Sequence, residues 1–434
     1  MTGCGIVTRL FKGLLLYFCA ISGVAYSSTD YIALNIVESS NEKYFQPVVL
    51  NGSSLKSLLG NPAMLIAVFA SHSNNLKMIP FQIDQKNKNG YFVLGNEKDI
   101  PKLTQYDECV FMPVDAGNRV DDIKAAFSEF PGVKNIVEVA LQKSSVNTEY
   151  VYVASFNGAL PSMQGLQDYV QYDVENDVVN ATRYQLGFDK EKPVLINTMR
   201  FSVNDEYSSN MIKAMRVNHK GVFTFFGLDS EFVRTEQDYT SKMTGYKDGL
   251  VRVIRKTENS VRMFWILKSP AFSIDYIMQG GGFSMDNAID MPFSIGTFFD
   301  DVTTDMMMAW REDKNLPVTY LSSKSVKNRA KIDGIMQEDE EQINASGDTE
   351  FMLSNDAGSM HVSMKKEKGF NVDHRAYVND GSGDDFGNIG FHTSKWEDVN
   401  NDKVHHMEFD ILFMGKDKSM DIDNALNLKE GAVN

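Results

Sequence analysis

Short strand-like segments run through almost the entire chain, and they constrain its fold more than any other feature. Gly, Asn, Asp or Ser residues bound them, and Val, Ile, Phe, Tyr and Met dominate them, as in Tyr31–Val37, Met64–Ala70, Ile136–Gln142, Ala271–Met278 and His406–Phe413. Many short strands separated by turn residues are typical of β-sandwiches. Helical periodicity is confined to two short pieces, 121–130 and 335–343. The sequence therefore predicts an all-β fold with very little helix, built as antiparallel β-sandwiches: either two sandwiches or one large supersandwich.

A domain boundary is expected where Gly158, Pro161 and Gly165 interrupt this strand-rich pattern. It divides the mature chain into an N-terminal β-sandwich domain, 28–157, and a larger C-terminal β-sandwich domain, 158–434. In the larger part, Leu250–Lys256 and Val261–Lys268 are expected to form a hairpin that turns at 257–260.

The first 27 residues have the pattern of a secretory signal peptide. Arg9 and Lys12 form a basic start, and the apolar stretch Gly13–Val24 precedes small residues suited to cleavage after Ala25 or Ser27. This stretch is shorter than the roughly 20 residues of a spanning helix. The mature chain is therefore expected to be secreted or periplasmic, with no membrane span after signal cleavage; the alternative is an uncleaved anchor.

The charge balance is acidic. The net charge is −15, and it becomes −17 when the signal peptide takes away Arg9 and Lys12 and no acids. An acidic chain is a poor partner for nucleic acid or anionic lipid, and its charge favours solubility, divalent cations or neutral ligands. After cleavage Cys109 remains without a partner for an internal disulfide. Its apolar neighbours predict a buried structural thiol rather than a nucleophile.

Three nearby segments form the best motif in the chain: Ile79–Asp84 (IPFQID), Asp107–Met112 (DECVFM) and Asp115–Gly117 (DAG). Together with Asp248–Arg255 (DGLVRVIR), they resemble an uncharacterised family of secreted bacterial β-sandwich proteins with a PFQID…DELVFMAxDAG signature. That family is similar in part to accessory domains of carbohydrate-active proteins. In the turn Gln85–Gly90, asparagines stand where relatives often have aspartates, which weakens a cation site there. The resemblance implies a secreted β-sandwich protein and carries no established activity to particular residues.

One loop near the C-terminus offers ligands for calcium. Asp380, Ser382 and Asp384 match positions 1, 3 and 5 of a calcium-binding loop, but position 12 is Phe391 rather than an acid. Calcium is therefore the candidate cofactor, and the alternative is a solvated turn between strands.

The last quarter of the chain also contains five of the seven histidines: His361, His374, His392, His405 and His406. Their spacing is not that of a zinc site, and adjacent His405 and His406 would point to opposite faces of a strand. His374, Arg375 and Tyr377 are the candidate catalytic residues, because a base, a carboxylate neutraliser and a proton donor are what a polysaccharide lyase needs. On a strand, however, His374 would face away from the other two.

Two tryptophans are candidate ligand-binding residues. Trp310 and Trp396 stand beside charged residues, and exposed aromatic rings could stack on sugars; the alternative is an ordinary half-buried position. The run Met306–Met308 is expected to serve packing.

These features favour a binding protein whose partner is a glycan or a cell-envelope component. The alternatives are a carbohydrate-active enzyme, of the polysaccharide lyase or epimerase type, and a structural subunit of an extracellular assembly. An enzyme would bring His374 or His392 together with acids and Arg, whereas a binding module would expose Trp310 or Trp396. The sequence does not indicate an oligomeric state.

Overall fold

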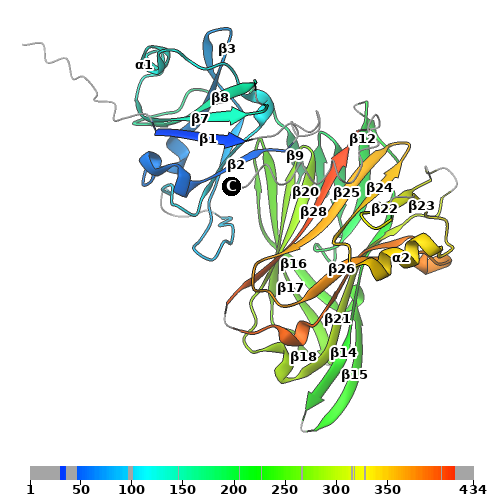
Figure 1. The fold of residues 1–434 in the computed structure, drawn as a ribbon. Helices are drawn as coiled ribbons and strands as arrows, with labels where there is room; N and C mark the ends of the chain where they lie inside the picture. The colour runs from blue at the N-terminus through cyan, green and yellow to red at the C-terminus, as the bar shows by residue number, and fades with distance from the viewer. Residues whose placement is uncertain are drawn as a thin grey trace, which may run out of the picture.

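Two β-rich units, each with its own hydrophobic core, make up the computed structural model (Figure 1). The structure describes residues 30–35, 46–95, 101–144, 146–204, 206–225, 227–264, 267–313, 316, 318–326, 329–401 and 403–415. The predicted signal peptide, residues 1–27, lies outside the described residues. Strands dominate and helix is sparse, so the prediction of an all-β, largely sandwich-like fold is confirmed.

The smaller unit contains two sheets that enclose one core. The first has the order β1 (Asp30–Asn35), β7 (Val133–Gln142), β8 (Thr148–Phe156), β3 (Ile66–His72) and β4 (Asn75–Met78). The second has the order β2 (Val48–Asn51), β6 (Glu108–Phe111) and β5 (Phe81–Asp84). β1 pairs with β7 in parallel, whereas the other pairings in this unit are antiparallel.

The larger unit is a sandwich whose broad layer is a ten-stranded sheet. Its path is β16 (Tyr239–Asp248), β17 (Arg252–Phe264), β19 (Phe272–Gln279), β20 (Gly282–Ile289), β28 (His405–Met414), β25 (Gly358–Lys366), β24 (Glu350–Asn355), β22 (Tyr320–Ser323) and β23 (Ala330–Lys331), with β18 (Leu267–Lys268) paired to β17.

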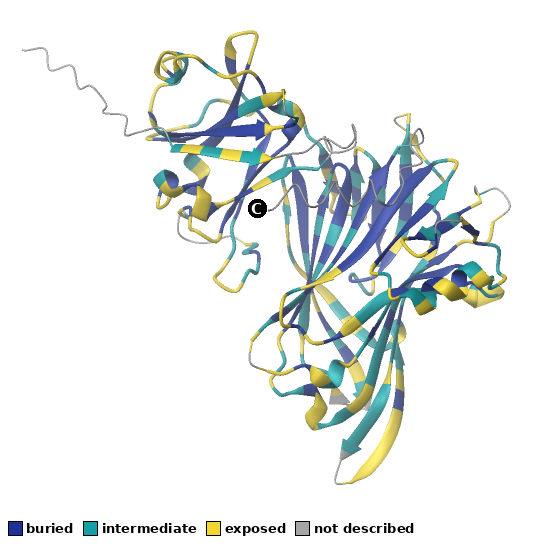
Figure 2. Ribbon diagram, in the orientation of Figure 1, coloured by how far each residue is buried: buried dark blue, intermediate teal, exposed yellow. Residues whose placement is uncertain are grey.

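Two five-stranded sheets cover the core side of this layer. One has the order β15 (Leu228–Thr235), β14 (Ile212–Phe225), β21 (Phe299–Trp310), β27 (Asn388–Ser394) and β26 (Asp373–Asn379). The other has the order β13 (Glu206–Tyr207), β12 (Ile196–Val203), β11 (Tyr184–Phe188), β10 (Val178–Ala181) and β9 (Val170–Asp173). β14 and β15 extend beyond the core, and most of β15 is exposed (Figure 2).

Alternation of side chains places the core on one face of the ten-stranded sheet. On β28, Met407, Phe409, Ile411 and Phe413 are buried in the core, whereas the residues between them point to the other face. We call that other face the outer face of the ten-stranded sheet.

Helices occur where the sequence predicts them. α1 (Ile123–Phe127) begins after Asp122, whose carboxylate accepts a hydrogen bond from the backbone N–H of Ala125, and α2 (Glu338–Ser346) ends before left-handed Gly347. Short 3-10 helices occupy Gly52–Ser54, Lys56–Leu58, Ala63–Leu65, Pro113–Asp115, Glu236–Asp238, Ile295–Thr297, Gly383–Asp385 and Trp396–Asp398. Within the described residues, no helix is long and apolar enough to cross a membrane.

The hairpin predicted around 257–260 is wrong. β17 continues straight through this segment, because both of its neighbours, β16 and β19, pair with it there. The turn-like residues Thr257 and Asn259 are buried, and the Asn259 amide nitrogen donates a hydrogen bond to Thr257 Oγ1 at 3.0 Å. Polar side chains with local partners can therefore occupy an inner strand.

Candidate functional site

A row of charged side chains crosses the outer face of the ten-stranded sheet. Neighbouring strands place directly opposite one another, in order, Lys256, Asp275, Asp286, Glu408 and Lys365. Like charges directly opposite each other destabilise a sheet. We call these three adjacent carboxylates and the two lysines that flank them the charged row. Repulsion between the carboxylates lowers the stability of the sheet, and destabilising arrangements of this kind often occur at functional sites.

A turn from the smaller unit lies over this row. Asn87 Oδ1 shapes the turn by accepting hydrogen bonds from the backbone N–H groups of Asn89 (2.9 Å) and Tyr91 (3.2 Å). Gly90, with φ of +86°, comes so close to His406 that an added Cβ would lie 3.9 Å from the imidazole ring. The rings of Tyr91 and His406 have centroids 6.0 Å apart.

Lys256 joins the turn to the row. Its ammonium group donates to the carbonyl of Phe92 at 3.0 Å and lies 5.4 Å from the centre of the Tyr91 ring. The same group is 3.5 Å from Oδ2 of Asp275. The covered end of the charged row thus contains an aromatic ring, a cation and an acid from both units of the chain.

Two titratable groups at this end of the row have shifted pKa values. His406 Nδ1 lies 3.0 and 3.1 Å from the two carboxylate oxygens of Asp286, and this hydrogen bond raises the pKa of His406. Burial raises the pKa of Asp275 to about 6, with Asp286 adding to the shift and Lys256 opposing it. Within the described part of the chain, Asp275 Oδ1 has no hydrogen-bond partner.

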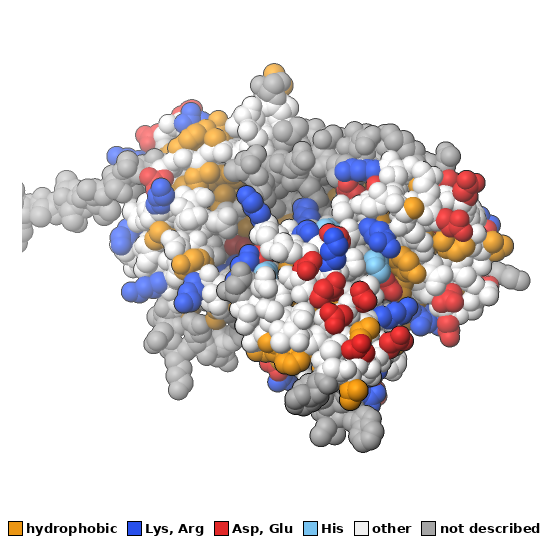
Figure 3. Space-filling view, turned by 60° about the horizontal axis from the view of Figure 1, so that its bottom comes forward, with side chains coloured by type: hydrophobic (Ala, Val, Ile, Leu, Met, Phe, Trp, Pro, Cys, Tyr) orange, Lys and Arg blue, Asp and Glu red, His pale blue; other side chains and the backbone are white. Residues whose placement is uncertain are grey.

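Solvent reaches the row unevenly. Asp275 is buried, whereas the side chains of Asp286 and His406 are 22% and 26% exposed. Beyond them, Ser284 donates to Asp410 at 2.7 Å on the same face. On the face of the molecule seen in Figure 3, acidic side chains lie next to basic ones and histidines.

A buried ion network fixes the turn over the row. Asp84 and Glu108, which belong to the first two motif segments, lie opposite each other on β5 and β6, and Arg252 of the larger unit binds both. Lys247 adds an ion pair to Asp84, and Lys86 adds one to Glu108, each at 2.8 Å. Burial opposes ionisation of the two acids, but Arg252 holds the pKa of each below its usual value. The motif therefore forms a joint between the two units.

The third motif segment has a related structural role. The hydroxyl group of Tyr169, just before β9, donates to both carboxylate oxygens of Asp115 at 2.9 and 3.0 Å. Gly117 passes so close to the backbone of Ser71 that a Cβ would lie 2.2 Å from its carbonyl oxygen. Only glycine fits such an approach.

The candidate catalytic residues His374, Arg375 and Tyr377 do not form one group. His374 Nε2 is 3.1 Å from the carbonyl oxygen of Met364, on the core side of β26. Arg375 and Tyr377 project from the opposite face, where His392 of β27 lies directly opposite Arg375. The histidine that lies beside Arg375 and Tyr377 is therefore His392 rather than the predicted His374.

The exposed position expected for Trp310 is wrong, whereas Trp396 is half-buried. Trp310 is 4% exposed, because it occupies a core-facing position at the end of β21. Trp396 is half-buried and packs edge to face on Phe370, with ring centroids 6.0 Å apart. The buried Trp310 therefore has no free aromatic face of the kind that stacks on sugars.

The calcium-like loop separates its proposed ligands. Asp380 is buried and accepts hydrogen bonds from the backbone N–H groups of Asp333, Gly334 and Gly387 at 2.8, 2.9 and 2.8 Å. Ser382 is exposed. Asp384, also exposed, forms ion pairs with basic residues of β14, Lys213 at 2.5 Å and Arg216 at 3.5 Å. Across the described residues, no three His, Cys, Asp or Glu side chains converge as a metal site would require.

The five histidines of the last quarter have separate partners. These are Glu350 for His361, Met364 for His374, Asp305 for His392, Asn400 for His405 and Asp286 for His406. As predicted, His405 and His406 face opposite ways: His405 is buried and stacks on Phe370, whereas His406 joins the charged row.

Sequence reasoning missed Asp275, Asp286 and the role of His406. Each lies in an ordinary strand pattern, and none belongs to the family motif. The one usable signal was acidic residues at outward positions of the predicted strands Ala271–Met278 and His406–Phe413.

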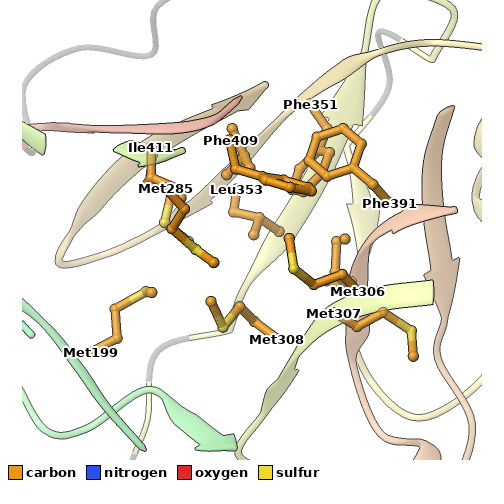
Figure 4. A pocket seen from close by; sticks show the side chains of 14 residues that line it. Met199, Met285, Met306, Met307, Met308, Phe351, Leu353, Phe391, Phe409 and Ile411 are labelled. Carbon is orange, nitrogen blue, oxygen red and sulfur yellow. The ribbon is translucent and has the colours of Figure 1, made fainter. Parts of the chain in front are cut away.

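The run Met306–Met308 lines an apolar cavity between the two layers of the larger sandwich. Its volume is about 40 Å³, and methionine, phenylalanine and aliphatic side chains surround it. Met306 and Met308 point into the cavity, whereas Met307 points away from it (Figure 4). Flexible thioethers fill irregular gaps of this kind, so the predicted packing role is confirmed for Met306 and Met308. Cys109 is likewise buried, and burial raises its pKa to about 12.

Comparison with known proteins assigns no family. No family model matches the chain, and no curated protein matches it. Among solved structures, the chain is similar to an alpha-mannosidase from Enterococcus faecalis V583, with a TM-score of 0.42 and 9% sequence identity. The match covers 92% of this chain and 46% of that enzyme, so the chain spans less than half of its length. At this similarity the match assigns neither a family nor an activity.

Proposed function

We propose that this protein binds a neutral glycan along the charged row of the ten-stranded sheet, with His406 and Tyr91 at the covered end. The observation that carries the proposal is the half-buried, solvent-accessible pair of His406 and Asp286 beneath a turn that a buried ion network holds in place. Sites on rigid elements, supported by a second layer of contacts, are typical of binding and catalysis.

The side chains in and beside the charged row are suited to binding a sugar. The hydroxyl groups of a sugar both donate and accept hydrogen bonds. The charged row offers carboxylate acceptors, and the ammonium group of Lys365 and the hydroxyl group of Ser284 lie beside them. The net charge of −15 disfavours a polyanion and favours a neutral ligand. A secreted or periplasmic protein would meet such a ligand as a free glycan or as a component of the cell envelope.

A second candidate function is acid–base chemistry on that glycan. Two titrating groups with shifted pKa values favour it: Asp275 at about 6 and His406 above its ordinary value of 6.5. Between these two values Asp275 is ionised while His406 is still protonated, so one base and one acid coexist. Such a pair suits an epimerase or a lyase better than a purely binding protein.

Thermal unfolding of the purified protein with a panel of neutral mono- and oligosaccharides tests the binding proposal. A ligand at 100 times its Kd stabilises the protein by about 2.7 kcal/mol. The shift should disappear in His406→Gln and persist in Lys403→Gln, a matched change at an exposed surface residue near the start of the same strand. If no sugar shifts the transition, the glycan proposal fails and a structural subunit of an extracellular assembly becomes the better explanation.

Product analysis with the same sugars separates binding from catalysis. Anomer exchange followed by NMR, together with chromatography of the oligosaccharides, detects epimerisation and cleavage. Turnover should then follow a bell-shaped pH profile that rises near pH 6 and falls above 6.5. Sugar binding without any turnover would assign a binding role alone.

A further inference from the structure

A second polar cluster lies on the outer face of the sheet β15–β14–β21–β27–β26, away from the charged row. Directly opposite positions on four neighbouring strands align Asn218, Asp305, His392 and Arg375. Tyr377 stands on the same face of β26, two residues beyond Arg375.

His392 has one ring nitrogen fixed and one left for a ligand. Its Nδ1 lies 2.6 Å from Oδ1 of Asp305, and a carboxylate can only accept, so Nδ1 carries a proton. In the neutral ring, Nε2 is then an acceptor, which suits a ligand hydroxyl group. The centroid of the Tyr377 ring is 6.1 Å from that of His392.

Tyr377 and Arg375 supply the donors. Burial raises the pKa of Tyr377, and Asp305 and Asp385 add to the shift, so its phenol keeps its proton. Arg375 lies beside it on the same face, and within the described residues its buried Nε has no hydrogen-bond partner. By contrast, the nearby cations Lys213 and Arg216 pair with Asp384.

From this arrangement we propose a second ligand site that binds a hydroxylated carboxylate, such as a uronic acid. The Arg375 guanidinium group binds the carboxylate, because its planar donors match the two carboxylate oxygens. Tyr377 donates a further hydrogen bond to that group, and His392 Nε2 accepts one from a neighbouring hydroxyl group. Since this site lies on a different sheet from the charged row, it goes beyond the glycan proposal and does not depend on it.

Isothermal titration calorimetry with glucuronate, glucose and acetate tests the site. Wild-type protein should bind glucuronate at least tenfold more tightly than either glucose, which lacks the carboxylate, or acetate, which lacks the hydroxyl groups. Arg375→Gln should weaken glucuronate binding by a factor of about ten or more, and Tyr377→Phe should weaken it by a smaller factor.

Two control variants make the result specific. Lys220→Gln removes an exposed cation from β14 and should leave glucuronate affinity unchanged. His406→Gln alters the first site, so the glucuronate affinity that remains in this variant is that of the second site. Failure of wild-type protein to bind glucuronate, equal affinity for glucose, or unchanged affinity in a folded Arg375→Gln variant would each overturn the proposal.

Discussion

Replacing Arg252 by Met should uncouple the two units of the chain. Arg252 is 3% exposed, and its Nε donates to Asp84 at 2.7 Å while a terminal nitrogen binds Glu108. Removing one partner of a buried ion pair costs about 3–5 kcal/mol, because the remaining charges stay buried without compensation. Lys247 and Lys86 still pair with the two acids, so we expect a loss near 3 kcal/mol in the free energy of unfolding.

A surface ion pair on the same strand provides the control. The Arg262 side chain is 59% exposed and pairs with Asp238 at 2.5 Å, so Arg262→Met should cost less than about 1 kcal/mol. All three tryptophans lie beyond residue 158. In urea titrations, tryptophan fluorescence therefore follows the larger unit, whereas circular dichroism follows both.

The two probes should coincide in wild-type protein and separate in Arg252→Met. The difference in the free energy of unfolding between wild-type protein and Arg252→Met should also decrease as the pH falls below about 3.8. The pKa values of Asp84 and Glu108 are lowered by folding, so their contribution is present above the ordinary values and is lost as they take up protons. Equal losses in Arg252→Met and Arg262→Met would refute the assignment of the network as a joint.

Three further predictions concern single side chains. Asp275→Asn should raise the free energy of unfolding by about 2–3 kcal/mol at pH 7 and by little at pH 4. The pKa of Asp275 is raised to about 6 in the folded protein, so its ionisation destabilises the folded protein at pH 7, whereas at pH 4 the folded protein keeps this carboxyl group protonated. Urea titrations at both pH values measure this difference. Asp380→Ala should lower the free energy of unfolding by roughly 3 kcal/mol, about 1 kcal/mol for each backbone N–H group that loses its acceptor. Calcium should not alter the melting temperature of the wild-type protein. Trp310→Ala truncates a core side chain and should lower the free energy of unfolding by about 3–5 kcal/mol. The variant protein that remains folded should bind any glycan ligand with wild-type affinity in calorimetry at pH 7.

The fold could be predicted because strand alternation and turn residues are local properties of the sequence. The failures arose where local composition misleads. Thr257 and Asn259 have turn propensity, yet two neighbouring strands enclose them. Trp310 precedes a charged segment and looks exposed, yet β21 ends with its ring still on the core side.

The candidate site could not be predicted, because its residues come together only through the pairing register of strands that are far apart in the sequence. Asp275 and Asp286 meet across a hairpin, but Glu408 joins them only because β28 inserts next to β20, more than a hundred residues away in sequence. The turn that covers them comes from the smaller unit. No window of the sequence contains these residues together, so the outward acidic residues can be seen singly in the sequence, but the cluster that they form cannot.

The same reasoning explains why the family-like motif says little about chemistry. Its acids Asp84 and Glu108 are bound by Arg252, and Asp115 is bound by Tyr169, so their charges hold the two units together. The groups that remain available to a ligand, such as His406 and Asp286, lie outside the motif. A relative that keeps the motif should therefore keep this joint and the position of the turn, while substitutions in the charged row alone could change what it binds.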